Sequence, residues 1–333
     1  MRPALSREVH LKSRPKYLPA LENFEIVETQ IPALDEGQVL VQNLFFSVDP
    51  YMRGRMVERT GANSFQLGKP MEGACVGVVL QSRSASIKAG DYALGEKSWR
   101  EYYISAETRI TKIELDGNPI QTYLGVLGMS GFTAYLGLYK VGQLQEGETV
   151  FVSAAAGSVG NVVCQLAKMK GCNVIGSAGS DEKVRWLQEL SGIEAFNYKN
   201  VESIRDALQQ FCPAGIDLYF DNVGGPHLEA ALECMRTHGR IVLCGMMSKM
   251  EQDNRPFALP NLNLAVRQRL TLTGFRASDR LDLYPKFFSD VSGWIKEGKI
   301  ALAETIVDGL ENAPAAFLGL FKGENLGKML VRV

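Results

Sequence analysis

The stretch Val150–Gly171, VFVSAAAGSVGNVVCQLAKMKG, decides how the rest of the sequence is interpreted. Its first residues are apolar, as in a buried strand, and its second half has apolar residues at helical spacing. Gly157 and Gly160 occupy the second and third positions of the pattern G-x-G-x-x-G, with Ala155 at the first. Bare backbone there lets a pyrophosphate approach the start of a helix, whose N–H groups and dipole attract anions. The turn therefore predicts a dinucleotide site, the alternative being an ordinary strand-to-helix connection.

The same alternation of strand and helix continues along the chain. The predicted strands are TVFVSA, NVIGSA, IDLYFD, RIVLCG and LTLTGF, and the last two are separated by a long irregular loop. The predicted helices are VGNVVCQLAKMK, SDEKVRWLQEL, VESIRDALQQF, PHLEAALECMR and LYPKFFSDVSGWIKEG. Strands that alternate with such helices predict right-handed βαβ units and an α/β fold with a doubly wound parallel sheet.

The flanking segments have a different texture. From about Leu21 to Ile113, short apolar runs such as QVLVQNLFFSV and CVGVVLQS are separated by turn residues, which is typical of antiparallel strands. After Ile300 come a predicted helix, APAAFLGLFKG, and a closing strand, GKMLVRV, which we expect to rejoin the first domain. The sequence therefore predicts a β-rich domain formed by residues 1–122 and 302–333, and a second domain formed by residues 123–301.

Composition excludes several classes of partner. The chain has 333 residues, with 36 basic against 37 acidic side chains and a net charge of −1, so it offers no field for nucleic acid or an anionic membrane. No segment reaches the roughly 18 consecutive apolar residues that a membrane span needs, and the N-terminus has no apolar leader. The six cysteines form no C-x-x-C pair, and we expect reduced, mostly buried thiols. These features predict a cytoplasmic protein.

The end of the second predicted strand bears on the choice of coenzyme. NAD-binding enzymes place an acid there to hold the ribose 2′-hydroxyl, whereas this chain has Ser177. A neutral strand end followed by Lys183 leaves room for a 2′-phosphate, although Lys183 also fits a solvated surface lysine. Asp181 and Glu182 are best explained as acids in a first helical turn that Ser180 caps. NADP(H) is therefore favoured over NAD(H).

Several motifs together resemble one family. AAAGSVG, GSDEK, FNYK, YFDNVGG, GRIVLCG, SVDPYMR and GENLGKMLV are similar to segments of the zinc-independent medium-chain dehydrogenase/reductases, in the branch of the prostaglandin reductases, also called leukotriene hydroxydehydrogenases or NADPH-dependent alkenal/one oxidoreductases. The resemblance extends from about Leu21 to Val333. It implies a GroES-like catalytic domain made from both chain ends, a Rossmann NADP(H)-binding domain between them, a cofactor cleft at their junction and a homodimer that pairs through LTLTGF.

The resemblance also implies cofactor contacts. Carried over to the matching positions, they fall on Met129, Thr133, Gly157, Ser158, Val159, Gly160, Lys183, Tyr198, Asn222, Cys244, Gly245, Met246, Met247, Ser248, Lys249, Met250, Phe275, Arg276, Ala277 and Asn325. Asn222 and Asn325 also fit plain turn residues, and Tyr198 a packing aromatic.

No metal is expected. Zinc enzymes of this fold need cysteine and histidine ligands that converge on one site. The chain has three histidines, none paired with a cysteine at a plausible site, and Met71 and Glu72 stand where zinc alcohol dehydrogenases have a His-Glu pair.

The implied reaction is hydride transfer from the nicotinamide to the β-carbon of an α,β-unsaturated aldehyde or ketone. The carbonyl oxygen then becomes an enolate oxygen, which needs a hydrogen-bond donor. Close relatives have a tyrosine in the loop after CG, but this chain reads CGMMSKM and has Met250 there. Tyr51, Ser248 and the cofactor's ribose 2′-hydroxyl are the candidate donors. The methionines fit either an adaptable apolar pocket or ordinary packing.

Two other functions remain open from the sequence. An NADPH:quinone reductase is the near alternative, because quinones are also enones. A catalytically idle NADP(H)-binding protein with a structural or regulatory role is the alternative of another class, and the missing tyrosine is the feature that favours it.

Overall fold

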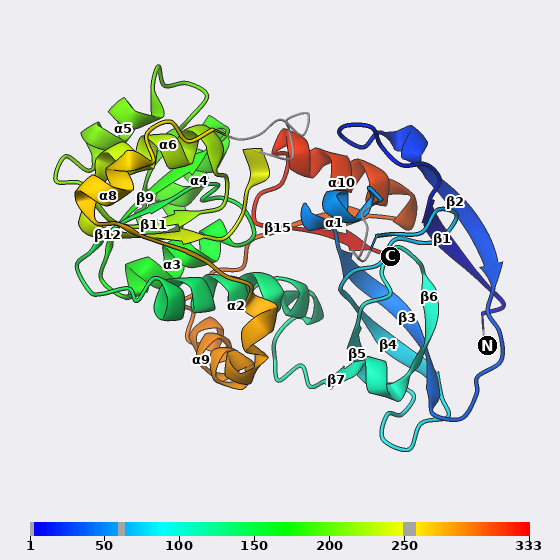
Figure 1. The fold of residues 1–333 in the computed structure, drawn as a ribbon. Coiled ribbons are helices and arrows are strands. Elements are labelled where there is room, and N and C mark those ends of the chain that lie inside the picture. The colour runs from blue at the N-terminus through cyan, green and yellow to red at the C-terminus, as the bar shows by residue number, and fades with distance from the viewer. Residues whose placement is uncertain (1–2, 59–63, 249–257) are drawn as a thin grey trace. The chain divides into compact units, whose positions relative to one another are not determined.

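The computed structural model describes residues 3–58, 64–248 and 258–333. The chain divides into two compact units, Met1–Leu124 with Glu304–Val333, and Gly125–Ala303. Figure 1 shows the chain tracing the first unit, then the second, and ending in the first. In the described part of the chain, no helix is long and apolar enough to cross a membrane.

The first unit is built mainly of strands. They are β1 (Leu5–Leu11), β2 (Phe24–Gln30), β3 (Gln38–Ser47), β4 (Cys75–Ser82), β5 (Tyr92–Gly95), β6 (Tyr102–Ala106), β7 (Thr111–Ile113), β14 (Glu304–Asp308) and β15 (Lys328–Arg332). β1 and β2 form an antiparallel ribbon, and the others form one sheet in the order β14-β15-β3-β4-β5-β7, with β6 also paired to β3. β15 pairs antiparallel with β3, so the C-terminal strand lies in the sheet of the first unit.

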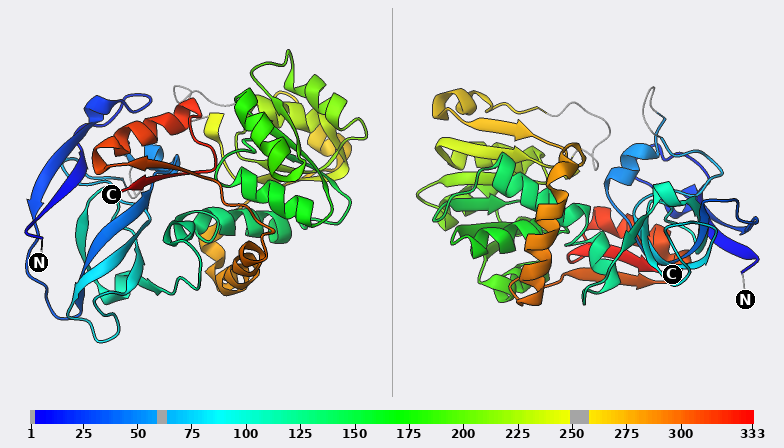
Figure 2. Two further views of the ribbon diagram at one scale, coloured as in Figure 1. Left: turned by 180° about the vertical axis from the view of Figure 1, so that it is seen from behind. Right: turned by 90° about the horizontal axis from the view of Figure 1, so that it is seen from below.

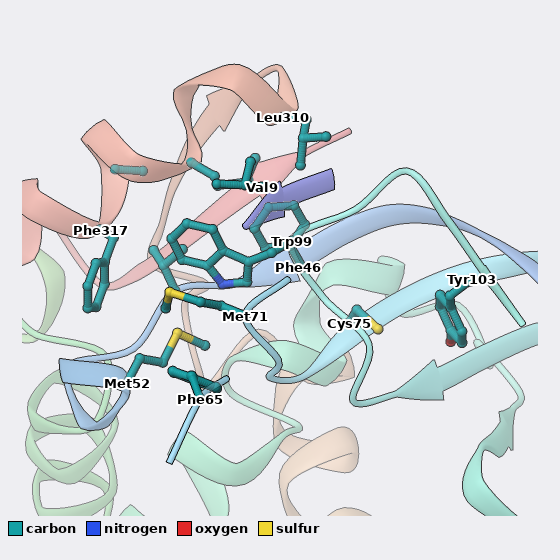
Figure 3. Close-up of a cluster of buried hydrophobic side chains, with 14 of the residues drawn as sticks. Val9, Phe46, Met52, Phe65, Met71, Cys75, Trp99, Tyr103, Leu310 and Phe317 are labelled. Atoms are coloured by element: carbon teal, nitrogen blue, oxygen red, sulfur yellow. The ribbon is translucent and has the colours of Figure 1, made fainter. Parts of the chain in front are cut away.

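The core of the first unit surrounds one tryptophan. Trp99 is fully buried, with Phe24 stacked on its ring at 5.7 Å and Phe46 at 6.0 Å between ring centroids. Phe317 of helix α10 (Ala313–Lys322) meets the indole edge-on at 5.9 Å. Figure 3 shows side chains from the N-terminal part of the chain, such as Val9 and Phe46, gathered around Trp99 together with Phe317 of the C-terminal helix α10. Burial of these rings therefore fastens the C-terminal helix to the N-terminal strands.

The second unit contains the predicted parallel sheet. Its strands are β8 (Thr149–Val152), β9 (Asn173–Ala178), β10 (Glu194–Asn197), β11 (Ile216–Asp221), β12 (Met235–Leu243) and β13 (Thr271–Gly274), in the order β10-β9-β8-β11-β12-β13. The order reverses between β8 and β11, which makes this pair the switch point where ligands bind in doubly wound sheets. The prediction of a Rossmann-type sheet beside a β-rich domain is confirmed.

Helices lie on both faces of this sheet (Figures 1 and 2). They are α2 (Met129–Leu136), α3 (Gly160–Met169), α4 (Asp181–Ser191), α5 (Ile204–Phe211), α6 (Gly225–Cys234), α8 (Asn263–Gln268) and α9 (Tyr284–Lys296). α5 and α6 pack together, as do α2 and α3.

Several elements differ from the sequence prediction, among them β10, α8 and β1. β10 has four residues with only two buried apolar side chains, so its pattern is too short to recognise. α8 lies in the segment predicted as an irregular loop, and none of its six residues is buried, so it leaves no amphipathic pattern. β1 was hidden by the charged residues in LSREVHL, although Val9 and Leu11 are fully buried.

Candidate functional site

The turn between β8 and α3 has the shape that the glycine pattern predicts. A Cβ atom on Gly160 would lie 2.2 Å from the carbonyl oxygen of Ala154, so only glycine fits there without moving backbone. A Cβ atom on Gly157 would meet nothing but that same oxygen, at 3.1 Å. α3 begins at Gly160, one residue later than the predicted segment VGNVVCQLAKMK, after Val159 as N-cap, and no side chain caps it. The helix N-terminus is thus left for an acceptor from outside the helix.

A buried amide holds this turn from within. Asn161 is 3% exposed, and its Nδ2 donates to the carbonyl oxygens of Gly157 at 2.6 Å and Ser158 at 3.2 Å. Gln165, one helical turn further on, donates from Nε2 to Asn161 Oδ1 at 3.2 Å. Gln165 also clamps the backbone of Ala301, donating to its carbonyl at 3.2 Å and accepting from its N–H at 2.8 Å. The turn is therefore tied to the segment by which the chain leaves the second unit.

The turn also has a polar atom to offer. Among the described residues, the Ser158 hydroxyl is buried and has no hydrogen-bond partner. A buried hydroxyl is normally satisfied, so an unpaired one beside an uncapped helix N-terminus fits a phosphate acceptor. Gly157, Ser158, Val159 and Gly160 thus form one contiguous turn whose shape and chemistry fit a dinucleotide pyrophosphate.

A tyrosine and a lysine meet at Gly179, just after β9, and a second lysine lies near enough for their charges to interact. A Cβ atom on Gly179 would lie 3.2 Å from the Tyr198 hydroxyl and 3.5 Å from Lys199 Cε. The pKa of Lys183 is lowered from its ordinary value, by burial and by the charge of Lys199. Two cations close enough to repel each other favour a bound anion between them. Ser177, where an NAD-binding enzyme has its acid, is fully buried inside β9.

The two acids near Lys183 are accounted for by local structure. Ser180 is the N-cap of α4, and its hydroxyl accepts from the Lys183 N–H at 3.3 Å, as predicted. Asp181 accepts from the side-chain amides of Asn197 at 2.7 Å and Asn200 at 3.0 Å. The Asp181 carboxylate is thus engaged with the loop after β10, which agrees with its interpretation as a first-turn residue.

A buried carboxyl group supports the DNVGG segment at the switch point. Asp221 is fully buried, and its Oδ1 accepts from the Gly224 N–H at 2.7 Å and the Val223 N–H at 3.0 Å. Burial raises the pKa of Asp221, and these hydrogen bonds oppose that rise. Asn222 is held from β8, because its N–H donates to Ser153 Oγ at 3.0 Å and its Nδ2 to Ser153 O at 2.8 Å. The Asn222 side chain is therefore held in place by Ser153, which agrees with its interpretation as a turn residue.

The loop after β12 packs on this segment. The N–H groups of Cys244 and Gly245 donate to Asp221 O, at 2.9 and 3.0 Å. Ser248 donates its N–H to Val223 O at 3.0 Å and lies with Oγ 2.7 Å from the same oxygen. The loop and DNVGG thus form one hydrogen-bonded unit.

Met246 and Met247 of this loop both contact the DNVGG segment. A Cβ atom on Gly224 would meet Met246 Sδ at 2.5 Å, so that thioether lies on the bare backbone of DNVGG. Met247 donates its N–H to Asn222 O at 3.4 Å. Lys249 and Met250 lie outside the described residues.

The remaining candidates of this unit lie on α2 and after β13. Met129 is 49% exposed, and Thr133 donates its hydroxyl to Met129 O at 2.7 Å. The Phe275 ring lies against Gly137, where a Cβ atom would be 2.7 Å from it. Arg276 is exposed and Ala277 is buried.

Two candidates belong to the first unit. Tyr51 is the first residue of helix α1 (Tyr51–Arg55), and its hydroxyl lies 3.3 Å from the point where a Gly73 Cβ atom would be. Partial burial, and then the charge of Asp49, raise the pKa of Tyr51 above its ordinary value, although 49% of the residue is exposed. Asn325 donates from Nδ2 to Gly327 O at 2.8 Å, which is the geometry of a turn residue.

In the described part of the chain, no three histidine, cysteine, aspartate or glutamate side chains group as metal ligands. His10 instead pairs with Glu8 at 2.8 Å. His227 is buried against the Tyr198 ring, at 4.9 Å between centroids, and burial lowers its pKa to about 4.

Three residues of this arrangement escaped the sequence prediction. Ser153 and Asn161 hold backbone turns from beneath, and nothing in their local sequence distinguishes them from other buried polar residues. Lys199 was identifiable, because it ends the FNYK motif directly after Tyr198.

The chain is similar to known proteins along nearly its whole length. The family model described as the N-terminal domain of oxidoreductase matches residues 7–113, and the model described as zinc-binding dehydrogenase matches residues 158–293. The 2-alkenal reductase (NADP(+)-dependent) of Nicotiana tabacum is 43% identical, over 98% of this chain and 97% of that protein. Prostaglandin reductase 1 of Mus musculus is 40% identical over 97% of each. A crystal structure of CurA from Vibrio vulnificus in complex with NADPH has a TM-score of 0.92 at 36% identity, covering 98% of this chain and 99% of that one.

Proposed function

Since this chain belongs to the zinc-independent medium-chain dehydrogenase/reductases of the prostaglandin reductase and 2-alkenal reductase family, we propose that it reduces the carbon–carbon double bond of α,β-unsaturated aldehydes and ketones with NADPH. The observation that carries the choice of coenzyme is that Tyr198 and Lys199 meet at Gly179, just after β9, with Lys183 near enough for the charge of Lys199 to lower its pKa. Two lysines there favour a 2′-phosphate, which NADH lacks.

The second unit has residues to hold the rest of the cofactor. The turn from Gly157 to Gly160 would take the pyrophosphate, with the Ser158 hydroxyl as an added donor. The hydrogen-bonded segments 222–225 and 244–248 follow β11 and β12 and would border the nicotinamide half, because ligands lie outside the carboxyl ends of such strands. Thr133 and Phe275 are proposed as further cofactor contacts because they match cofactor-binding positions of the family.

Tyr51 is the proposed donor to the substrate carbonyl. When bound, NADPH supplies a hydride to the β-carbon of the enone. The charge that develops on the carbonyl oxygen needs a preorganised donor, and one such donor contributes about 3 kcal/mol. Tyr51 can meet this need because a tyrosine hydroxyl is protonated at neutral pH and can donate to the oxygen.

Ser248 is less suited to the same task. Its hydroxyl proton is directed to Val223 O at 2.7 Å, so it is not available to an enolate at the same time. We propose that Ser248 holds the loop after β12, and that Tyr51 is the catalytic hydroxyl of the chain.

The quaternary state and compartment belong to the same proposal. β13 is the last strand of the six-stranded sheet, so a second copy can extend the sheet there and cover its edge. Val266, on the helix before β13, is 82% exposed. Val266→Asp should therefore shift the sedimentation of a homodimer toward the monomer. All six cysteines are free thiols, which suits a reducing compartment such as the cytoplasm.

The function is tested by following NADPH consumption with the purified protein and a panel of alkenals, enones, oxo-prostanoids and quinones. We expect enals and enones to be reduced, and Tyr51→Phe to lower kcat by about 100-fold with little change in the KM for NADPH. Tyr92→Phe, on an exposed tyrosine of β5, is the matched control and should keep full activity.

Other outcomes separate the alternatives. Consumption with quinones alone would identify a quinone reductase. Tight NADPH binding without reduction of any member of the panel would indicate a protein that binds the coenzyme without catalysis. A Tyr51→Phe variant as active as Tyr92→Phe would remove Tyr51 from the reaction.

A further inference from the structure

A buried lysine of the last strand pairs with the residue that begins the DPY motif. Lys328 is 3% exposed, and its Nζ donates to Asp49 Oδ1 at 2.7 Å and to Val48 O at 3.2 Å. The second carboxylate oxygen of Asp49 accepts from the Ser47 hydroxyl. Both oxygens of Asp49 are therefore engaged, one of them by a residue 279 positions away in the sequence.

Strand register brings these two residues together. β15 pairs antiparallel with β3, with Leu330 opposite Ser47. Continuing that register past the end of β3 places Lys328 opposite Asp49. The ion pair thus lies two residue positions beyond the last paired residues of the ladder, where β3 has ended and the chain turns into α1.

The pair is poorly explained by stability alone. A lysine removed from water loses several kcal/mol of hydration, and replacing a buried ion pair by apolar side chains is often neutral or stabilising. What an ion pair adds is direction, because Nζ must stay near both Asp49 Oδ1 and Val48 O. This contact therefore specifies where the chain lies as it enters α1.

The segment so specified is the one that carries Tyr51. The Met52 N–H donates to Asp49 O at 3.1 Å, so the first turn of α1 is hydrogen-bonded to the backbone of the residue that Lys328 holds. At the other end of the tyrosine, the hydroxyl lies over the bare backbone of Gly73. Asp49 therefore fixes the backbone at Tyr51, and the missing side chain of Gly73 leaves space beside the Tyr51 hydroxyl.

We propose that Lys328 is a positioning residue, which acts through Asp49 to fix the start of α1 and so to aim the Tyr51 hydroxyl at the substrate carbonyl. This inference rests on the proposed function for the role of Tyr51. The positional effect itself, Lys328 on α1, is independent of which substrate is used.

The first arm of the test needs no activity. Hydrogen exchange of peptides covering residues 50–56 is compared between the unmodified protein, Lys328→Met and Lys322→Met. Lys322 is the control, because its side chain is 70% exposed on α10. We expect exchange in α1 to quicken at least about tenfold in Lys328→Met and not in the control. Unchanged exchange in Lys328→Met would overturn the proposal, whether or not any enone is reduced.

The second arm measures coupling to Tyr51. Lys328→Met should lower kcat about 10- to 100-fold with little effect on the KM for NADPH, as expected for a misplaced group. In the Tyr51→Phe background the same substitution should have no further effect on kcat. Independent, multiplicative losses would contradict action through Tyr51. Absence of activity in the unmodified protein would refute the proposed function and leave the exchange arm to decide.

A double variant separates positioning from charge balance. Asp49→Asn with Lys328→Met removes both charges and leaves no buried ion, so thermal stability should return toward that of the unmodified protein. A positioning role predicts that kcat stays low in this variant, because the directional contact is still missing. Recovery of kcat together with stability would show that Lys328 is merely structural.

Discussion

Alanine substitutions at Gly157 and Gly160 test the phosphate turn, because the two glycines face different surroundings. At Gly160 the new methyl group would lie 2.2 Å from Ala154 O and 2.9 Å from two further backbone atoms. At Gly157 it would meet one atom, at 3.1 Å. The same substitution should therefore strain the backbone packing at Gly160. At Gly157 it should instead fill space beside the turn, where a phosphate would bind.

The magnitudes follow from these contacts. Ordinary contact begins at 3.4 Å, so Gly160→Ala must part the turn from the helix by about 1 Å. Overpacking of this kind costs about 1–3 kcal/mol, or about 2–12 °C in the unfolding midpoint of a unit of this size. Gly157→Ala needs only a few tenths of an ångström and should cost less than about 1 kcal/mol. Its methyl group should instead weaken a phosphate hydrogen bond of about 1.5–3 kcal/mol, raising the Kd for NADPH about 10- to 150-fold.

Thermal unfolding by circular dichroism and titration of NADPH fluorescence measure the two effects separately. Gly160→Ala should melt earlier, and Gly157→Ala should melt like the unmodified protein but bind NADPH weakly. An unchanged midpoint for Gly160→Ala would refute the packing argument. Unchanged NADPH affinity in Gly157→Ala would show that the pyrophosphate does not approach this turn.

Three further outcomes are expected. Lys183→Ala should raise the KM for NADPH more than tenfold with little change in kcat; Lys199→Ala should do the same to a smaller extent, and an unchanged preference for NADPH over NADH in both variants would remove the 2′-phosphate assignment. The pKa of His227 falls to about 4 from an ordinary 6.5, so its contribution to stability is complete above pH 6.5 and is lost as the pH falls through 4, by about 3 kcal/mol. Denaturant titrations should show a smaller loss over that range for His227→Phe, and parallel curves would contradict it. Incubation with a strong chelator should leave NADPH oxidation unchanged, and a loss that zinc restores would require a metal site.

The fold was predictable where local pattern and burial agree. The predicted segments NVIGSA and IDLYFD coincide with β9 and β11, because buried parallel strands leave continuous apolar runs. β10 was not predictable, because its four residues are too few to show a strand pattern. It is a strand because it pairs with β9, and that pairing cannot be seen in the local sequence.

The residues of the candidate site also fall into two groups, those that the sequence was enough to predict and those that it was not. Gly157, Gly160 and the Ser180 cap obey rules that act within a few residues, so the sequence was enough to predict them. Ser153 gains its role from Asn222, 69 residues away, and this depends on β8 and β11 being neighbours in the sheet. Contacts of that kind follow from topology, which propensity and spacing do not specify.

The clamp of Gln165 on Ala301 bears on how this protein can be recombined with its relatives. Both bonds use backbone atoms of residue 301, so any side chain is acceptable there except that of proline, which lacks the N–H. A chimera that takes its C-terminal segment from another family member therefore needs the glutamine on its Rossmann side and the same chain length up to the crossover. One inserted residue before position 301 would misalign both bonds, and Asn161 and the turn it holds would lose their support from below.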